Sequence, residues 1–255
     1  MQGGDKVLLS VRDLHTHFAV RNGVVKAVDG VSFDVEYGQT LCVVGESGSG
    51  KSVTARSILQ IVDEPGRIVS GAMVLRMPDG RKVDLASLHP RSKEIRAVRG
   101  ATIAMIFQEP MSSLSPVHTV GNQIMEVLQL HLKMDKARAR ARCVELLGQV
   151  EIPNPEAAVD RYTFEFSGGM RQRVMIAMAL ACKPDVLIAD EPTTALDVTV
   201  QAQIFDLISE LRERTGTAVM LITHDMGAIA EMADRVVVMY AGRIVEAGAV
   251  RDILG

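Results

Sequence analysis

Residues 45 to 52 read Gly-Glu-Ser-Gly-Ser-Gly-Lys-Ser and match the phosphate-loop pattern GxxxxGK[ST] in full. Glycines allow the backbone to wrap closely around phosphate oxygens and to point its N–H groups inward. Lys51 can reach the β- and γ-phosphates of a nucleoside triphosphate, and Ser52 can bind Mg²⁺. The residue types and their spacing therefore predict a site for a nucleotide and its magnesium ion.

The sequence on either side of this loop supports the same prediction. The apolar run Leu41–Val44 has the composition of a buried parallel strand, and the residues from Lys51 to about Asp63 have a helical pattern. A helix that starts at the loop adds its positive N-terminal end to the site. A dinucleotide fingerprint would need a third glycine where Val53 stands, and a merely flexible glycine loop is the other alternative. The predicted nucleotide-binding residues here are Gly45, Glu46, Ser47, Gly48, Ser49, Gly50, Lys51, Ser52 and Val53.

Two carboxylates follow a second apolar run. Val186–Ala189 is predicted to be a buried strand, and Asp190 and Glu191 come directly after it. Ligands bind at the carboxyl ends of strands in parallel sheets. Asp190 is predicted to hold Mg²⁺ through water, and Glu191 to orient or deprotonate the water that attacks the γ-phosphate. A solvated acidic pair at a strand end is the alternative, and the phosphate loop in the same chain favours the catalytic interpretation.

The remaining elements come from periodicity and turn residues. Residues 7–20 and 24–35 read as two strands around an Asn22-Gly23 turn. Strands that alternate with helices predict an α/β fold with a parallel sheet covered on both faces. A helix-rich middle, about residues 86–165, interrupts this alternation and is predicted to be an inserted subdomain. The other predicted elements are turns and short strands over 66–100 (with turns at Gly71, 78–80 and Pro90), helical sequence over about 119–148, helices from Ser167, over 198–215 and over 225–232, and strands at 218–223, 235–240 and 244–247.

Composition limits the class of protein. A chain of 255 residues with 47% hydrophobic content can form one large domain. The net charge of −3 does not indicate a nucleic-acid partner. Cys42, Cys143 and Cys182 lack metal-ligand or CxxC spacing, so they are predicted to be small buried residues in a reducing compartment. The sequence shows neither a signal-peptide core nor an apolar stretch of about 18 residues, so any membrane role is expected to run through partners on the cytoplasmic side.

The segment from Phe166 to Arg173 reads FSGGMRQR and resembles the signature of ABC ATPases, which is usually LSGGQ. The signature starts a helix, whose exposed N–H groups and dipole can bind a γ-phosphate. The resemblance implies that Ser167, Gly168, Gly169 and Met170 contact an ATP molecule held by the phosphate loop of another subunit. A serine-capped helix start with glycines for close packing is the structural alternative.

Further motifs of the same family follow in the family's order. Gln108 resembles the glutamine of the Q-loop, which senses the γ-phosphate, reaches Mg²⁺ and touches the membrane partner. Ala195-Leu196-Asp197 resembles the D-loop, and His224 resembles the switch histidine. The resemblance thus implies catalytic roles for Gln108, Glu191 and His224. Phe18 resembles the aromatic residue that stacks on adenine, with a core phenylalanine as the alternative.

The resemblance covers about residues 8 to 250. It implies a P-loop NTPase (RecA-like) core with an antiparallel β subdomain and an inserted helical subdomain, which is the ABC ATPase fold. Residues 1–255 would form a single ATP-binding domain. Its nucleotide-binding core and β subdomain would comprise 1–85 and 166–255, and its helical subdomain about 86–165.

Two longer stretches, 108–124 and 190–204, resemble the oligopeptide, dipeptide and nickel importers. The resemblance implies an ATPase that drives peptide uptake at the cytoplasmic face of the inner membrane, with ATP and Mg²⁺ as cofactors. Its partners would be a second ABC ATPase subunit (identical or paralogous), two permease subunits and, indirectly, an extracytoplasmic binding protein, with no nucleic acid. Members of this branch often continue with a C-terminal extension whose cysteines can hold an iron–sulfur cluster. This sequence stops at Gly255 without such cysteines, either because it is a piece of a longer protein or because it is a short member, and no iron–sulfur site is predicted.

Three alternatives remain at this stage. The transported solute could be nickel or another small solute. A soluble ABC ATPase of DNA repair or of ribosomes is disfavoured, because the sequence has neither long coiled-coil insertions nor a second cassette. A regulatory subunit that binds ATP without hydrolysing it is disfavoured because every catalytic residue named above is present.

Overall fold

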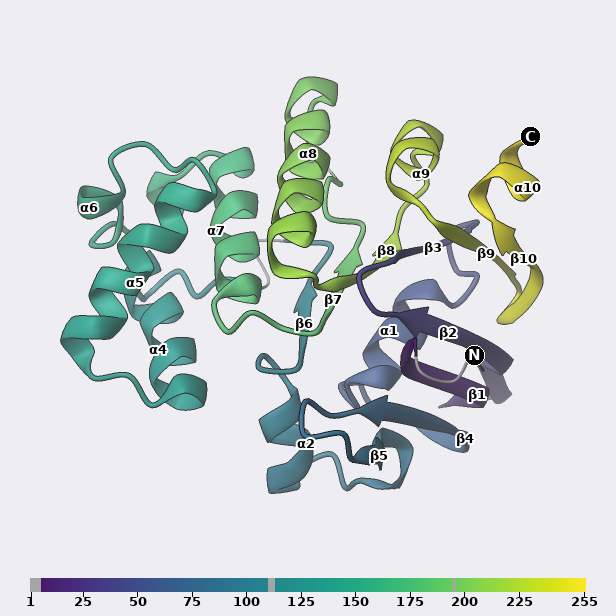
Figure 1. The fold of residues 1–255 in the computed structure, drawn as a ribbon. Coiled ribbons are helices and arrows are strands. Elements are labelled where there is room, and N and C mark those ends of the chain that lie inside the picture. Colours follow the sequence, from purple (N-terminus) through teal and green to yellow (C-terminus); the bar gives the residue numbers. More distant parts are fainter. Residues whose placement is uncertain (1–5, 110–112, 195) are drawn as a thin grey trace. The chain divides into compact units, whose positions relative to one another are not determined.

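The structure is a computed structural model that describes residues 6–109, 113–194 and 196–255 (Figure 1). The chain forms two compact units, which we call the first unit (Met1–Arg99 with Ala218–Gly255) and the second unit (Gly100–Thr217). These units break the chain at 99 and 217 rather than near 85 and 165. The division into a nucleotide-binding core and a helical subdomain therefore stays a prediction.

An antiparallel sheet of the first unit is built on a long hairpin. β1 (Val7–Val20) pairs with β2 (Gly23–Glu36) around the predicted Asn22-Gly23 turn. The sheet order is β2-β1-β4-β5, with β4 at Gly66–Arg76 and β5 at Lys82–Asp84. The predicted turn at Gly71 is wrong, because Gly71 lies inside β4. Its φ of 108° and a Cβ position only 2.6 Å from the Asp13 carbonyl oxygen show that the glycine permits a close approach of β1.

A second set of strands in the first unit is parallel at its centre. β3 (Thr40–Gly45) lies between β8 (Ala218–Ile222) and β9 (Arg235–Tyr240), parallel to both, and β10 (Arg243–Ala249) is antiparallel to β9. All five residues of β8 are buried, which explains the continuous apolar run in its sequence.

The helices of the first unit are short. α1 (Lys51–Ile58) ends five residues before the predicted end at Asp63, because Gln60 adopts a left-handed backbone with φ of 53°. α9 begins at Met226 with Asp225 as its N-cap, one residue later than predicted. Besides α1, the described helical segments of this unit are a 3₁₀ turn at Leu85–Ser87, α2 at Lys93–Val98, α9 at Met226–Met232 and α10 at Val250–Leu254.

The second unit combines two parallel strands with a group of helices. β6 (Ile103–Ile106) pairs with β7 (Val186–Asp190), and α7 (Gly168–Leu180) packs on β6. The other described helical segments of this unit are α4 at Val120–Leu132, α5 at Lys136–Gln149, α6 at Pro155–Ala158, α8 at Val198–Thr215 and a 3₁₀ turn at Thr163–Glu165. α4, α5 and α7 lie side by side (Figure 1).

The helical sequence predicted over about 119–148 forms two helices rather than one. Lys133 has a left-handed backbone with φ of 55°, which ends α4, and the Asp135 carboxylate then caps α5 by accepting a hydrogen bond from the Arg138 N–H. α8 has the predicted bounds and buries the predicted apolar face, although Val200 is only half-buried.

Two of the three cysteines have the buried environment that was predicted, and Cys182 does not. Cys42 and Cys143 are buried free thiols, and burial raises the pKa of each to about 12. Cys182 is partly exposed. Across the described residues, no helix is both long enough and apolar enough to span a membrane.

Candidate nucleotide-binding site

The phosphate loop, residues 45–52, joins β3 to α1 in the first unit. Its backbone curves through three glycines with positive φ: Gly45 at 148°, Gly48 at 79° and Gly50 at 101°. A Cβ on Gly45 would lie 2.1 Å from the Met239 carbonyl oxygen, and one on Gly50 would lie 2.2 Å from the Ala27 carbonyl oxygen. Two of the glycines are therefore required because the loop packs directly on the backbones of β9 and β2.

Lys51 is held against the backbone of this loop. Its side chain is buried, and its Nζ donates hydrogen bonds to the carbonyl oxygens of Gly45 and Glu46, each at 2.8 Å. A third contact joins Nζ to Ser49 Oγ at 3.4 Å. The loop therefore fixes a positive charge at the start of α1, where the helix dipole also favours an anion.

The packing of Gly50 predicts the stability of a loop variant. Gly50→Ala should lower the free energy of unfolding by at least about 3 kcal/mol, because the methyl group collides with a backbone carbonyl and the positive φ adds strain. Gly48→Ala is the matched control, since nothing lies within 4 Å of its Cβ position and only the strain of about 1–2 kcal/mol remains. Urea unfolding of both variants measures the difference, and equal losses would contradict the packing argument.

The acidic pair of the second unit lies at the carboxyl end of β7. Asp190 is the last residue of this fully buried strand, with 2% of its surface exposed. Glu191 follows with a φ of 46°, which turns the chain out of the strand. Glu191 Oε2 accepts hydrogen bonds from Gln108 Nε2 and from Thr194 Oγ1, both at 3.0 Å. The structure thus brings two predicted catalytic residues together across 83 positions of sequence.

The contact between Gln108 and Glu191 follows from the pairing of two strands. β6 and β7 are parallel, with Ile106 opposite Ala189, so the residues after each strand emerge at the same edge. Thr194 is a functional candidate that the sequence analysis missed. Its only signal is its position three residues after Glu191, which lets a threonine hydroxyl reach back to the carboxylate.

The signature segment forms the start of α7. Ser167 is the N-cap, and its Oγ accepts a hydrogen bond from the Met170 N–H at 3.4 Å. A Cβ on Gly169 would lie 2.9 Å from Val200 Cγ1 of α8, so this glycine permits close packing of the two helices. Gly168 lies nearer the surface, 3.6 Å from Leu196 by the same measure. The capping interpretation is therefore correct for Ser167, and it is compatible with anion binding at the same helix end.

Asp197, His224 and Phe18 are the other predicted site residues. Asp197 caps α8 by accepting a hydrogen bond from the Val200 N–H at 3.0 Å, and Ala195 of the same motif lies outside the described residues, as do residues 110–112. His224 is exposed in the connection between β8 and α9. The half-buried Phe18 lies on β1 with its ring against Gly66 of β4, where a Cβ would approach Phe18 Cε1 to 2.5 Å.

The predicted site residues are thus divided between the units. The first unit holds the phosphate loop, Phe18 and His224, and the second unit holds Gln108, the acidic pair and the signature. The proposed magnesium ligands supply a hydroxyl (Ser52), an amide (Gln108) and a carboxylate (Asp190), which are the oxygen ligands that Mg²⁺ prefers.

A buried parallel strand, a glycine-rich loop and a lysine held against that loop define a P-loop nucleotide-binding protein. The ABC transporter family matches residues 28–194, and the chain belongs to this family. The predicted ABC ATPase fold and family are confirmed. The chain is an ATP-binding, ATP-hydrolysing subunit of this family.

Curated relatives match nearly the whole chain. A probable peptide ABC transporter ATP-binding protein of Sinorhizobium fredii is 54% identical over 99% of this chain and 74% of its own length. The dipeptide transport ATP-binding protein DppD of Bacillus subtilis is 50% identical over 96% of this chain and 72% of its own. The oligopeptide transport ATP-binding protein OppD of Bacillus subtilis is 52% identical over 96% of this chain and 67% of its own length. Among solved structures, a dimeric bacterial ABC transporter cassette has a TM-score of 0.83 and 25% identity, over 96% of this chain and 99% of that chain.

Proposed function

We propose that this chain drives the uptake of oligopeptides or dipeptides by an ABC importer, at the cytoplasmic face of the inner membrane. The observation that carries the proposal is the near-complete match to ATP-binding proteins whose names specify peptide, dipeptide or oligopeptide transport. A nickel or other small-solute importer is the alternative, because the sequence motifs of these branches are alike.

The residues of the two units supply the chemistry of hydrolysis. Lys51 would pair with the β- and γ-phosphates of ATP, while Ser52, Gln108 and Asp190 would hold Mg²⁺. When bound, the ion neutralises charge on the phosphate oxygens. Glu191 orients the attacking water and accepts its proton, and the hydrogen bonds from Gln108 and Thr194 hold its carboxylate in position. His224 contacts the γ-phosphate, and Phe18 stacks on adenine.

The signature completes the site of a partner subunit. The start of α7 offers the backbone N–H groups of its first turn and the positive end of a helix dipole, which suit a γ-phosphate. Two ATPase subunits would therefore close on two ATP molecules, each held by the phosphate loop of one subunit and the signature of the other. Closure would be passed to two permease subunits, which receive the solute from an extracytoplasmic binding protein.

Ser167→Ala should lower Mg·ATP turnover by about tenfold to a hundredfold while leaving the affinity of a single subunit for ATP unchanged. The hydroxyl is expected to contact only the ATP of the partner subunit. Loss of the cap should also cost about 1 kcal/mol of stability. Ser92→Ala removes the equivalent cap of α2, where Ser92 Oγ accepts from the Ile95 N–H at 3.3 Å, and should not affect turnover. Equal turnover in the two variants would contradict the role of the signature.

Solute uptake tests the substrate directly. Proteoliposomes that contain this chain, its permease subunits and its binding protein should accumulate a radiolabelled dipeptide when ATP is supplied. The same vesicles with Glu191→Gln serve as the control and should accumulate none. Accumulation of radiolabelled nickel without accumulation of peptide would replace the proposed substrate with the alternative.

A further inference from the structure

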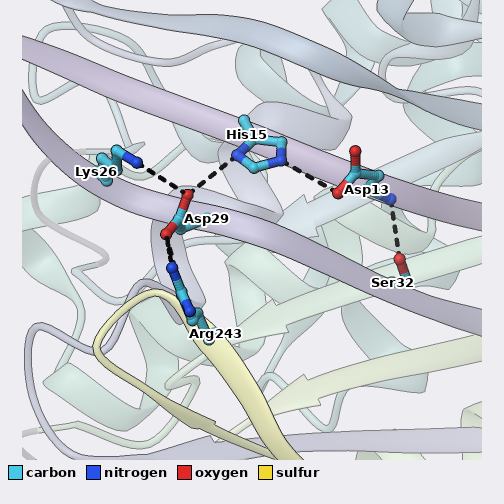
Figure 2. A network of polar contacts seen from close by, with 6 residues as sticks. All are labelled: Asp13, His15, Lys26, Asp29, Ser32 and Arg243. Carbon is cyan, nitrogen blue, oxygen red and sulfur yellow. Dashed lines mark hydrogen bonds and ion pairs between the residues drawn. The ribbon is translucent and has the colours of Figure 1, made fainter.

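A network of charged side chains surrounds Asp29 on β2 (Figure 2). Only 10% of the Asp29 side chain is exposed. Arg243, the first residue of β10, donates to Asp29 Oδ2 from Nε at 3.0 Å and from Nη2 at 2.6 Å. Lys26 Nζ lies 3.6 Å from Asp29 Oδ1. The hydrogen bond from Arg243 lowers the pKa of Asp29 below its ordinary value, so the carboxylate is charged at neutral pH.

His15 of β1 holds the same carboxylate from the other side. His15 Nδ1 lies 3.2 Å from Asp29 Oδ1, and His15 Nε2 lies 3.1 Å from Asp13 Oδ1 (Figure 2). A neutral imidazole has one N–H, so both contacts are hydrogen bonds when the ring carries two protons. The Asp13 N–H donates to Ser32 Oγ at 2.9 Å. The network therefore joins β1, β2 and β10.

The backbone extends this network to the phosphate loop through two hydrogen bonds. The Asp29 N–H donates to the Gly242 carbonyl oxygen at 2.8 Å, and the Gly242 N–H donates to the Ser49 carbonyl oxygen at 3.0 Å. Gly242 has a φ of 80°, and a Cβ there would lie 2.9 Å from the Lys26 carbonyl oxygen. The turn between β9 and β10 thus contacts both β2 and the phosphate loop through the backbone of Gly242.

The positive charges around Asp29 argue against a metal site formed by the neighbouring residues. His15, His17 and Asp29 place ligand atoms within 4.8 Å of one another, a spacing that could hold a metal ion, and it is the one such group among the described residues. Lys26 and Arg243 already contact the Asp29 carboxylate. A divalent cation would therefore join two positive charges around one carboxylate, which is electrostatically unfavourable.

We propose that Asp29 and Arg243 are positioning residues for the phosphate loop. Their ion pair holds the turn at Ala241 and Gly242 against β2. The hydrogen bond from the Gly242 N–H then fixes the position of the Ser49 carbonyl. The loop is then held in the conformation that binds phosphate, although neither side chain belongs to the loop. The inference rests on the proposed nucleotide binding by this loop.

Equilibrium binding of Mg·ATP to the purified chain tests the role. Asp29→Asn and Arg243→Gln should each weaken ATP binding by about tenfold, because small displacements of a binding loop have large effects. Arg243→Lys should have an intermediate effect, since an ammonium keeps the charge but loses the two-pronged geometry of the guanidinium. The Arg243 side chain is 68% exposed, so its variants should fold normally.

Asp34→Asn is the matched control. Asp34 also lies on β2 and also pairs with an arginine, Arg12 of β1, with 2.7 Å between Asp34 Oδ1 and Arg12 Nη2. Within the described part of the chain, the side-chain hydrogen bonds of this pair stay on β1 and β2, so its variant should bind ATP like the wild type. Affinities in Asp29→Asn and Arg243→Gln that equal that of Asp34→Asn would overturn the proposal.

Hydrogen exchange separates failure of this inference from failure of the proposed function. Amide exchange in peptides that cover residues 46–51 and 240–244 should be about tenfold faster in Arg243→Gln than in Asp34→Asn, without any nucleotide present. Unchanged exchange would overturn the positioning role. A wild-type chain that binds no ATP would overturn the proposed function instead, and the exchange rates would still decide whether Arg243 holds the loop.

Discussion

Replacing Glu191 by glutamine should lower Mg·ATP turnover by at least about a hundredfold and leave ATP binding nearly unchanged. The substitution removes the carboxylate that we propose accepts a proton from the attacking water. It keeps the shape of the side chain and an oxygen that can still accept the hydrogen bonds from Gln108 and Thr194. Bound ATP would then persist, and the closed dimer that ATP stabilises should accumulate.

Phosphate release and size-exclusion chromatography with Mg·ATP measure both effects. Glu145→Gln is a suitable control, because Glu145 is an exposed residue of α5 that pairs with Arg142 on the same helix. The control should retain wild-type turnover. Turnover of Glu191→Gln close to the wild-type rate would remove Glu191 from the mechanism and would favour another base.

The second large effect concerns Lys51. Lys51→Ala should weaken ATP binding by about a hundredfold, because it removes the charge-assisted contact that we propose Lys51 makes with two phosphates. The hydrogen bonds from Nζ to Gly45 and Glu46 are lost as well, so the loop itself should become less ordered. Turnover should fall at least as far as binding.

Fluorescence titration with an ATP analogue measures this loss. Lys82→Ala, at an exposed position on β5 of the same unit, removes the same kind of charge away from the loop and should bind normally. Wild-type affinity in Lys51→Ala would show that the phosphates bind elsewhere. The two variants are complementary, since Lys51→Ala should fail at binding and Glu191→Gln should fail only at hydrolysis.

The sequence predicted the parts of the fold that depend on local patterns. Residues close together in the sequence predict the Asn22-Gly23 turn, the apolar strand before the phosphate loop and the buried face of α8. The structure confirms all three. Backbone geometry set the limits of these predictions. Gly71 was predicted as a turn, but it serves a close approach between two strands, which only the register of β1 and β4 can reveal.

Interactions between distant segments were the least predictable part. The contact of Gln108 with Glu191 depends on the pairing of β6 with β7, which no single segment encodes. The ion pair of Asp29 with Arg243 joins residues 214 positions apart, and neither belongs to a recognised motif. Family resemblance could predict which residues contact the nucleotide, whereas the residues proposed to hold them in place could be found only in the structure.

Two ATPase subunits are proposed to complete each catalytic site together. The most direct test is the Mg·ATP turnover of the purified chain measured against its own concentration. Because each ATP is expected to lie between the phosphate loop of one subunit and the signature of the other, turnover per subunit should rise with concentration and then reach a plateau. Turnover per subunit that is constant from the lowest to the highest concentration, in a chain that stays monomeric, would contradict the claim.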